Sequence, residues 1–180
     1  MVLRSGEFTV NIAYVKNGVP EAGVIYIPVK EELFFADTEK GAYKLSNEDG
    51  LLTRINENKE PDCTLEVLIE KAQKLPYPTP HEGFMIVASR SHLNAETEEY
   101  IERMKKEHAG REAGSKSRSL SLIAEGVADV YPRFAPTMEW DTAAGHAIIR
   151  AAGKEVYQAN TDKPLIYNKE DLLNPWFIAK

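Results

Sequence analysis

Residues 140–147 (WDTAAGHA) constrain the fold of this chain more than any other stretch. They predict a helix that carries Asp141 on its first turn, followed by small residues that let this helix end pack very close to a neighbouring element. A helix N-terminus offers free N–H groups and about half a positive charge, which suit a phosphate. Asp141 could hold Mg²⁺ beside that phosphate, because hard cations prefer carboxylate oxygens. It could instead be a helix cap only, since Asp is among the best capping residues. This stretch alone leaves both interpretations open.

Composition limits the class of protein. The chain has 180 residues, 43% hydrophobic and 28% charged, which is ordinary for a globular protein with one substantial core and at most a small satellite. A net charge of −6 argues against a nucleic-acid polymer as partner. The single cysteine, Cys63, allows no disulfide framework and fits a reducing compartment. No signal peptide follows Met1, and no apolar run approaches the roughly 20 residues that cross a bilayer. We therefore expect a cytoplasmic protein without a transmembrane segment.

The first part of the chain has the pattern of an antiparallel sheet. Residues 7–15 and 22–27 form two strand-like runs, and the intervening Asn17-Gly18 is a strong hairpin signal because Gly accepts positive φ. Residues 32–37 and 41–45 predict two more strands, in a meander that ends near residue 56. Residues 64–74 carry a helical pattern with Thr64 as its cap. The proline-rich segment after it enforces an extended link, so we expect two units, 1–75 and 76–180.

The second part alternates strands and helices, which predicts a layered α/β unit. A short apolar run at 84–88 is typical of a buried strand. The other predicted strands and helices are strands at 128–131, 154–157 and 177–179, and helices at 94–108, 117–125 and 141–152.

Several motifs resemble those of one known family. Residues 140–147, together with 124–133 (AEGVADVYPR), are similar to the CysQ-type 3'(2'),5'-bisphosphate nucleotidases of the inositol monophosphatase superfamily. Residues 6–13, 23–29, 89–92 (SRSH) and 173–175 (LNP) extend the similarity over nearly the whole chain. The resemblance implies an α/β (α+β layered) fold, an inositol monophosphatase-like sandwich of helices and sheets, here N-terminally truncated. It also implies Mg²⁺-dependent removal of the 3'-phosphate of adenosine 3',5'-bisphosphate, giving AMP and phosphate.

This chain departs from the family pattern at its beginning. Family members carry a Glu-Glu pair on a helix and a later D-P-L-D-G-T motif, which supply most of the metal ligands. Met1 to Ser5 lie just beyond where D-G-T would stand, and the pairs Glu31-Glu32 and Glu98-Glu99 occur in other contexts. In a two-metal phosphatase each ion needs several oxygen ligands, which Asp141 alone cannot supply. We therefore expect weak or no hydrolysis by this polypeptide unless the missing half comes from another chain.

The resemblance also suggests which residues contact substrate. It implies that Asp141 ligates the metal and that His92, Ser115, Arg118 and Arg133 hold the nucleotide. The SRSH segment follows a buried strand and precedes a helix, a common ligand position in α/β proteins, although Ser91 or Asn94 could simply cap that helix.

Ser115 and Arg118 lie in a Gly-Ser-Lys-Ser-Arg segment that opens another helix and could cradle an anion. A flexible basic loop is the alternative for this segment. The family usually has Lys at the position of Arg118, which is not an equivalent residue. For Arg133 the alternative is a solvated arginine on a turn. We expect His146 to be packed rather than catalytic, and Trp140 to be a structural anchor rather than a base-stacking platform.

Two other functions stay open. One is an inositol or fructose phosphate phosphatase of the same superfamily. The other is a noncatalytic nucleotide-binding or subunit-interaction domain. Sheet and helix faces left bare by the absent half would favour a homodimer or a complementing N-terminal half as partner.

Overall fold

A computed structural model describes residues 8–77, 83–89, 94–108, 111–115 and 119–180 of the chain. Its first part is a five-stranded antiparallel sheet whose strands lie in sequence order: β1 (Val10–Lys16), β2 (Val19–Ile27), β3 (Glu32–Asp37), β4 (Gly41–Ser46) and β5 (Gln73–Leu75). Asn17 and Gly18 take positive φ values of 53° and 79° between β1 and β2, which confirms the predicted hairpin. The predicted strands at 32–37 and 41–45 are confirmed.

Two predictions for the first part of the chain were wrong. After β4 the chain forms helix α1 (Leu51–Asn56), because Leu51 and Leu52 bury their side chains against the sheet. Helix α2 (Leu65–Lys71) begins as predicted, with the Thr64 hydroxyl accepting a hydrogen bond from the Val67 N–H at 3.4 Å. It ends three residues early, since Leu75 instead pairs with Ala42 of β4 and enters the core.

The second part contains a mixed sheet and three helices. Strand β6 (Met85–Ser89) runs parallel to β7 (Arg111–Ser115), and β10 (Phe177–Ala179) pairs antiparallel with β8 (Tyr131–Arg133) and β9 (Val156–Gln158). A parallel bridge between Ile86 and Val130 joins the two groups of strands. The helices are α3 (Ala95–His108), α4 (Ser119–Glu125) and α5 (Glu139–Ala151). Strand β7 was not predicted, and its last two residues, Gly114 and Ser115, were expected in the segment that opens α4.

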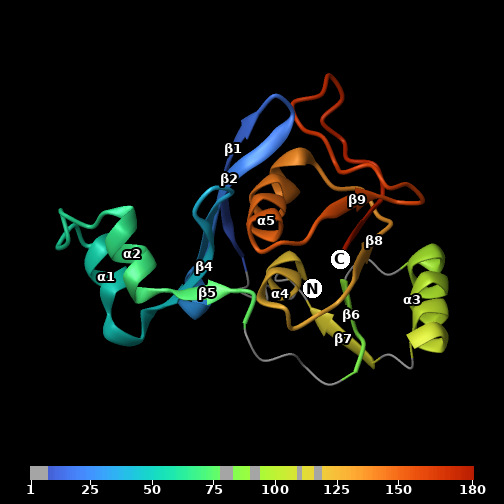
Figure 1. Cartoon of the computed structure of the whole chain (residues 1–180), viewed down its shortest axis with the longest axis horizontal. Helices are drawn as coiled ribbons and strands as arrows, with labels where there is room; N and C mark the ends of the chain where they lie inside the picture. The colour runs from blue at the N-terminus through green and yellow to red at the C-terminus, as the bar shows by residue number, and fades with distance from the viewer. Residues whose placement is uncertain (1–7, 78–82, 90–93, 109–110, 116–118) are drawn as a thin grey trace, which may run out of the picture.

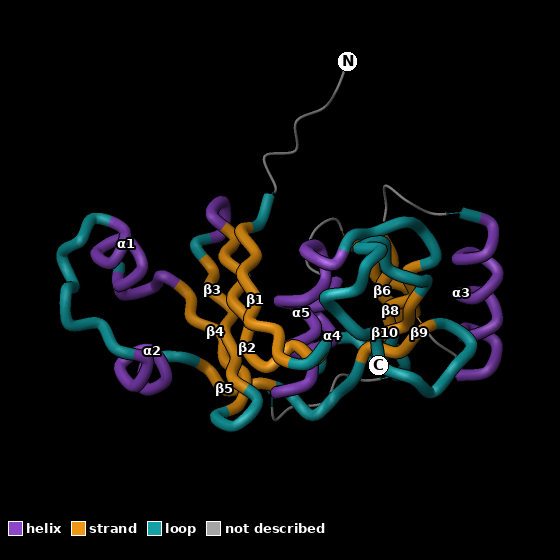
Figure 2. Tube along the Cα trace, turned by 90° about the horizontal axis from the view of Figure 1, so that it is seen from above, coloured by secondary structure: helices purple, strands orange, loops and turns teal. Residues whose placement is uncertain are grey.

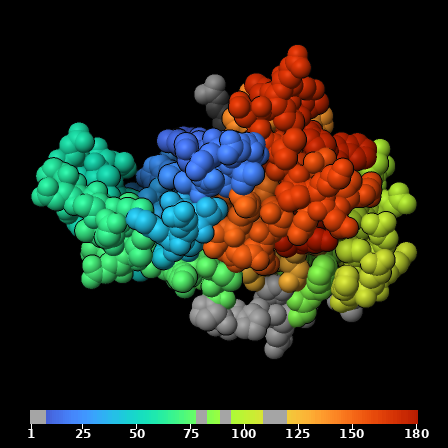
Figure 3. Space-filling model, turned by 45° about the horizontal axis from the view of Figure 1, so that its top comes forward, coloured from blue at the N-terminus to red at the C-terminus, as the bar shows by residue number. Residues whose placement is uncertain are grey.

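The elements stack in five layers, helix on sheet on helix on sheet on helix (Figures 1 and 2). Helices α4 and α5 lie between the two sheets, α3 covers the outer face of the second sheet, and α1 and α2 cover the far face of the first. In the space-filling view α1 and α2 form a lobe at one end, and the surface of the β1–β2 hairpin is uncovered (Figure 3). The layered α/β fold that the sequence predicted is confirmed.

Helix α5 packs very closely on the first sheet through small residues, as predicted. A Cβ added to Gly23 of β2 would lie 2.5 Å from the carbonyl oxygen of Ala144 and 3.0 Å from the Cβ of Ala147. Ala143, Ala144, Ile148 and other residues of the helix share one buried cluster with residues of both sheets. The predicted division of the chain at residues 75 and 76 stays a prediction. No helix within the described ranges has the length and apolar character needed to cross a membrane.

Candidate functional site

Three parallel strand segments end at one edge of the second sheet. Ser89, the last residue of β6, pairs directly with Ser115, the last residue of β7. On the other side of β6, Ile86 is bridged to Val130, so Ser89 and Arg133 each stand three residues beyond this bridge. Ligands of open α/β sheets bind at the carboxyl ends of such strands. The segments predicted to hold the nucleotide therefore begin at a common edge.

Not every predicted contact residue can be placed. His92 and Arg118 lie outside the described residues, as does Ser91. Of Ser115 only the backbone position in β7 is described. Asn94 does cap α3, since its Oδ1 accepts a hydrogen bond from the Thr97 N–H at 3.0 Å. The substrate-binding roles of these residues stay predictions.

Arg133 is a buried cation at this edge. It lies in β8, paired with Phe177 of β10, and its side chain is 8% exposed. Its Nε atom is buried and has no hydrogen-bond partner in the described part of the chain. Leaving a charged polar group buried without a full set of partners is costly, and an anionic ligand removes that cost through charge-assisted hydrogen bonds. The alternative of a solvated arginine on a turn is wrong, because Arg133 is buried and lies in β8; the strand predicted at 128–131 overlaps β8 only at Tyr131.

Asp141 caps the helix that carries it. Helix α5 begins at Glu139, and Oδ2 of Asp141 accepts a hydrogen bond from the Met138 N–H at 2.8 Å. This is half of a capping box, in which the third helical residue reaches back to the N-cap. The capping interpretation is thus confirmed. An ionised carboxylate has about four acceptor positions, so the cap leaves room for a cation, and the metal role of Asp141 stays a prediction.

Hydrogen bonds with the segment that contains Leu172 and Asn174 hold the beginning of α5. The Leu172 carbonyl accepts from the Glu139 N–H at 3.0 Å. The side-chain amide of buried Asn174 donates to the Met138 carbonyl and to the Thr142 hydroxyl, both at 2.9 Å. Sequence reasoning assigned no role to Asn174. Its only signal was a polar residue among apolar ones in the LNP motif.

Glu139 stabilises the same helix end from the other side. Its carboxylate accepts hydrogen bonds from the Asn168 N–H at 2.6 Å and from the ammonium and N–H groups of Lys169. Burial opposes ionisation of Glu139, but the bonds from Lys169 and Asn168 outweigh it and lower the pKa of this carboxyl. The first turn of α5 therefore carries two carboxylates, Glu139 and Asp141, with separate structural partners.

His146 is packed, as predicted. Its ring is fully buried and lies between the Tyr167 hydroxyl, 2.9 Å from Nδ1, and the carboxylate of Glu155 at Nε2. Burial lowers the pKa of His146 despite the neighbouring carboxylate. These partners give His146 a structural role within α5.

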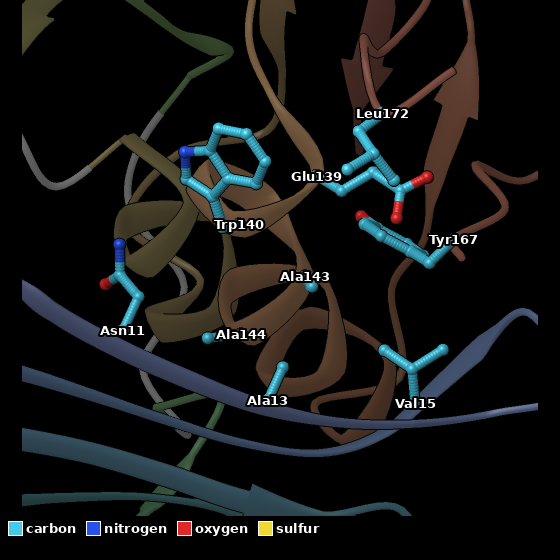
Figure 4. A pocket seen from close by; sticks show the side chains of 9 residues that line it. All are labelled: Asn11, Ala13, Val15, Glu139, Trp140, Ala143, Ala144, Tyr167 and Leu172. Carbon is cyan, nitrogen blue, oxygen red and sulfur yellow. The ribbon is translucent and has the colours of Figure 1, made fainter. Parts of the chain in front are cut away.

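Trp140 is not the structural anchor that we predicted. Its side chain is 59% exposed and lines a pocket of about 270 Å³ between α5 and β1 (Figure 4). Asn11, Ala13 and Val15 of β1 form the opposite wall, and Tyr167 and Leu172 close one end. The pocket adjoins the helix end that carries Asp141.

The described residues do not form a complete metal site. In these parts of the chain no group of three or more His, Cys, Asp and Glu side chains could hold an ion. Asp141 is therefore the single predicted ligand whose position is described, and one carboxylate does not fit the several oxygen ligands that Mg²⁺ requires.

Comparison with known proteins places the chain in a family. Residues 2–176 match the model of the inositol monophosphatase family. The chain belongs to the inositol monophosphatase family. The crystal structure of CysQ from Bacteroides thetaiotaomicron, a bacterial family member, is similar with a TM-score of 0.90 and 57% identity, over 98% of this chain and 64% of that one. The resemblance predicted from the WDTAAGHA stretch is confirmed.

Two curated relatives bear names that state an activity. The chain is 40% identical to the 3'(2'),5'-bisphosphate nucleotidase CysQ of Shigella flexneri and 39% identical to that of Escherichia coli strain K12, each over 177 residues. These matches cover 98% of this chain but 61% of either relative. The chain thus spans about three fifths of the length of the curated relatives that it matches.

Proposed function

We propose that this chain is the nucleotide-binding part of a phosphomonoesterase that hydrolyses the 3'-phosphate of adenosine 3',5'-bisphosphate, giving AMP and phosphate. The observation that carries the proposal is the edge at which Ser89, Ser115 and Arg133 converge, with a buried guanidinium among them. The similarity to CysQ nucleotidases supports the choice of substrate. The lone Cys63 supports a reducing, cytoplasmic location.

In this proposal Arg133 binds phosphate, and His92, Ser115 and Arg118 hold the rest of the nucleotide. Charge-assisted hydrogen bonds contribute roughly 1.5–3 kcal/mol each, enough for a few cations to bind a doubly phosphorylated ribose despite the net negative charge of the chain. Asp141 is a ligand of Mg²⁺. The described residues do not complete that metal site, and in this proposal the other ligands come from a complementing polypeptide.

A complementing N-terminal half would supply those ligands. The exposed strand β1 offers it a place to bind, since β1 is an edge strand whose Val10, Ile12 and Tyr14 are 45%, 64% and 58% exposed. Unpaired edges with apolar side chains favour pairing with another strand. A homodimer formed through β1 is the competing arrangement, and sedimentation of the isolated chain separates the two.

The test is phosphate release from adenosine 3',5'-bisphosphate in the presence of Mg²⁺. The chain is assayed alone and in a mixture with a second polypeptide. This second polypeptide is the part of the Shigella flexneri relative that has no counterpart in this chain. We expect little release from the chain alone and clear release from the mixture, which Asp141→Asn in this chain abolishes. No release in either sample would reject the enzymatic proposal. Faster turnover of an inositol phosphate would reassign the substrate.

A noncatalytic nucleotide-binding domain is the second candidate, favoured by the incomplete metal site among the described residues. Calorimetric titration with AMP, without metal, addresses it. Binding of AMP, combined with no phosphate release from the complemented mixture, would support this function over the enzymatic one.

A further inference from the structure

An aromatic stack lies beside the buried guanidinium. Phe134 directly follows Arg133 and is 8% exposed. The Trp176 ring stacks on the Phe134 ring, with centroids 5.5 Å apart and planes at 24°, and Tyr100 meets Phe134 edge-on at 5.4 Å. Trp176 itself is 44% exposed. Part of a large aromatic surface is therefore open to solvent at a position fixed by buried rings.

The register of the sheet places this stack at the candidate site. Phe177 pairs with Arg133, so Trp176 and Phe134 are the next opposed residues, just past the carboxyl end of β8. That end lies level with Ser89 and Ser115. Successive side chains of an extended chain point to opposite faces. The guanidinium and the indole therefore flank the strand end, one on each side.

Hydrogen bonds to their backbone carbonyl groups hold both Phe134 and Trp176. The carbonyl oxygen of Phe134 accepts from Nδ2 of Asn94 at 2.6 Å, and Asn94 also caps α3. The carbonyl oxygen of Trp176 accepts from the Ala159 N–H at 2.7 Å. Because the stacked rings of Phe134 and Trp176 are already held in place, they lose little conformational entropy when a ligand binds, which raises its affinity.

Trp140 provides a contrast. It is also exposed, but no aromatic ring of the described residues stacks on it, and no buried cation lines its pocket, which lies between β1 and α5 and is closed by Tyr167 and Leu172. Trp176 combines exposure, ring support and a neighbouring buried cation. A ligand that satisfies all three carries an anionic group and a flat aromatic group a short distance apart.

We propose that the Trp176 indole is the surface on which the nucleobase stacks while Arg133 binds a phosphate, which makes Trp176 a specificity-determining residue for nucleotides over sugar phosphates. This inference rests on the proposed function. The nucleotide passes over the end of β8, with its phosphate on the Arg133 side and its base on the Trp176 side. A sugar phosphate without a base makes the phosphate contact with Arg133 and lacks the stacking contact with Trp176.

The chain has two tryptophans, which makes the test specific. In Trp140→Phe the emission comes from Trp176 alone, and in Trp176→Phe it comes from Trp140 alone. Each variant is titrated with adenosine 3',5'-bisphosphate and with ribose 5-phosphate, and affinities are measured by calorimetry. We expect the nucleotide, and not ribose 5-phosphate, to quench Trp176 saturably, with no comparable change for Trp140.

Affinity gives the second readout. Base–aromatic stacking is worth roughly 1–3 kcal/mol per base, so Trp176→Ala should weaken nucleotide binding about 5- to 150-fold and leave the affinity for ribose 5-phosphate unchanged. Trp176→Phe keeps an aromatic face and should restore most of the affinity. Val127→Ala, at an apolar residue that is 40% exposed, is the matched control and should change neither affinity.

The outcomes separate the two proposals. If the nucleotide binds wild type but Trp176→Ala binds it equally well, the stacking inference is overturned and the proposed function stands. If Trp176→Ala weakens both ligands equally, Trp176 is structural and the inference is again overturned. If neither ligand binds wild type, the proposed function fails, and the inference fails with it.

Discussion

The N–H of Met138 donates a hydrogen bond of 2.8 Å to the carboxylate of Asp141, so the side chain proposed to ligate metal also caps the helix that carries it. Capping removes rotational freedom from the carboxylate before any ion arrives. Because Asn174 holds the carbonyl of the same Met138, the position of Asp141 depends on the C-terminal segment of the chain as well.

Substitutions at Asp141 should separate capping from metal binding. Asn has a side-chain oxygen that can accept the Met138 bond, so Asp141→Asn should change the free energy of unfolding by less than about 0.5 kcal/mol while abolishing Mg²⁺-dependent phosphate release in the complemented mixture. Asp141→Ala should also lose about 1 kcal/mol of stability. Urea unfolding of the variants checks the first part. Full phosphate release by Asp141→Asn would exclude the metal role.

Asn174 should be more important for stability than its short side chain suggests. Asn174→Ala removes the hydrogen bonds from the Asn174 amide to the Met138 carbonyl and to the Thr142 hydroxyl at a buried site, which costs about 1–3 kcal/mol, although the Asp141 N–H and the Tyr167 hydroxyl still donate to these two acceptors. Chemical denaturation measures this loss. The control is Asn56→Ala, at an exposed position, which should stay within about 0.5 kcal/mol of wild type. Equal effects of the two substitutions would argue against a stabilising role of the Asn174 hydrogen bonds.

Gly23 should tolerate no side chain. Its missing Cβ lets the Ala144 carbonyl approach, so Gly23→Ala forces β2 and α5 apart and costs about 1–3 kcal/mol. The neighbouring Ala22→Ser, at a partly exposed position, serves as control. A thermal unfolding midpoint for Gly23→Ala equal to that of wild type would show that the two layers are not in rigid contact.

The His146–Glu155 pair predicts how stability varies with pH. Burial lowers the pKa of His146 below its usual 6.5. Burial opposes ionisation of Glu155, but bonds from His146 and the Val156 N–H outweigh it and lower its pKa below 4.5. Because both pKa values are lower in the folded chain, His146 and Glu155 take up protons more readily in the unfolded chain. The stability that this pair contributes is therefore fully present above about pH 6.5 and is lost on acidification.

Urea unfolding between pH 8 and pH 5 tests this dependence. The free energy of unfolding should decrease below about pH 6.5 in wild type, and His146→Gln should show a flatter profile in the range where histidine titrates. An increase in stability on acidification would contradict the assignment of a buried neutral imidazole.

Local chemistry determined what could be predicted from the sequence. The Asn17-Gly18 hairpin, the Thr64 cap and the strand Glu32–Asp37 depend on residues close together in the chain, and all were predicted correctly. Strand β7 could not be found in the same way, because Arg111–Ser115 has no apolar alternation and becomes a strand by pairing with β6. Helix α1 depends equally on a distant partner, the sheet face that buries its two leucines.

The candidate site shows the same division. The WDTAAGHA stretch indicated a closely packed helix with an acidic first turn, and both features are confirmed. The exposure of Trp140 could not be predicted, since a large apolar ring indicates burial unless the covering partner is known. The burial of Arg133 depends on the pairing of β8 with β10 and was likewise not visible in the local sequence.

Arg133→Met tests the central claim most directly. Replacing an incompletely paired buried cation by an apolar side chain of similar length is often neutral or stabilising by about 1–4 kcal/mol, whereas loss of a phosphate contact weakens binding about tenfold or more. We predict that Arg133→Met keeps or gains stability in urea and loses calorimetric affinity for adenosine 3',5'-bisphosphate. Unchanged affinity together with lower stability would contradict the account, because Arg133 would then be a structural residue and not the anion-binding group of the site.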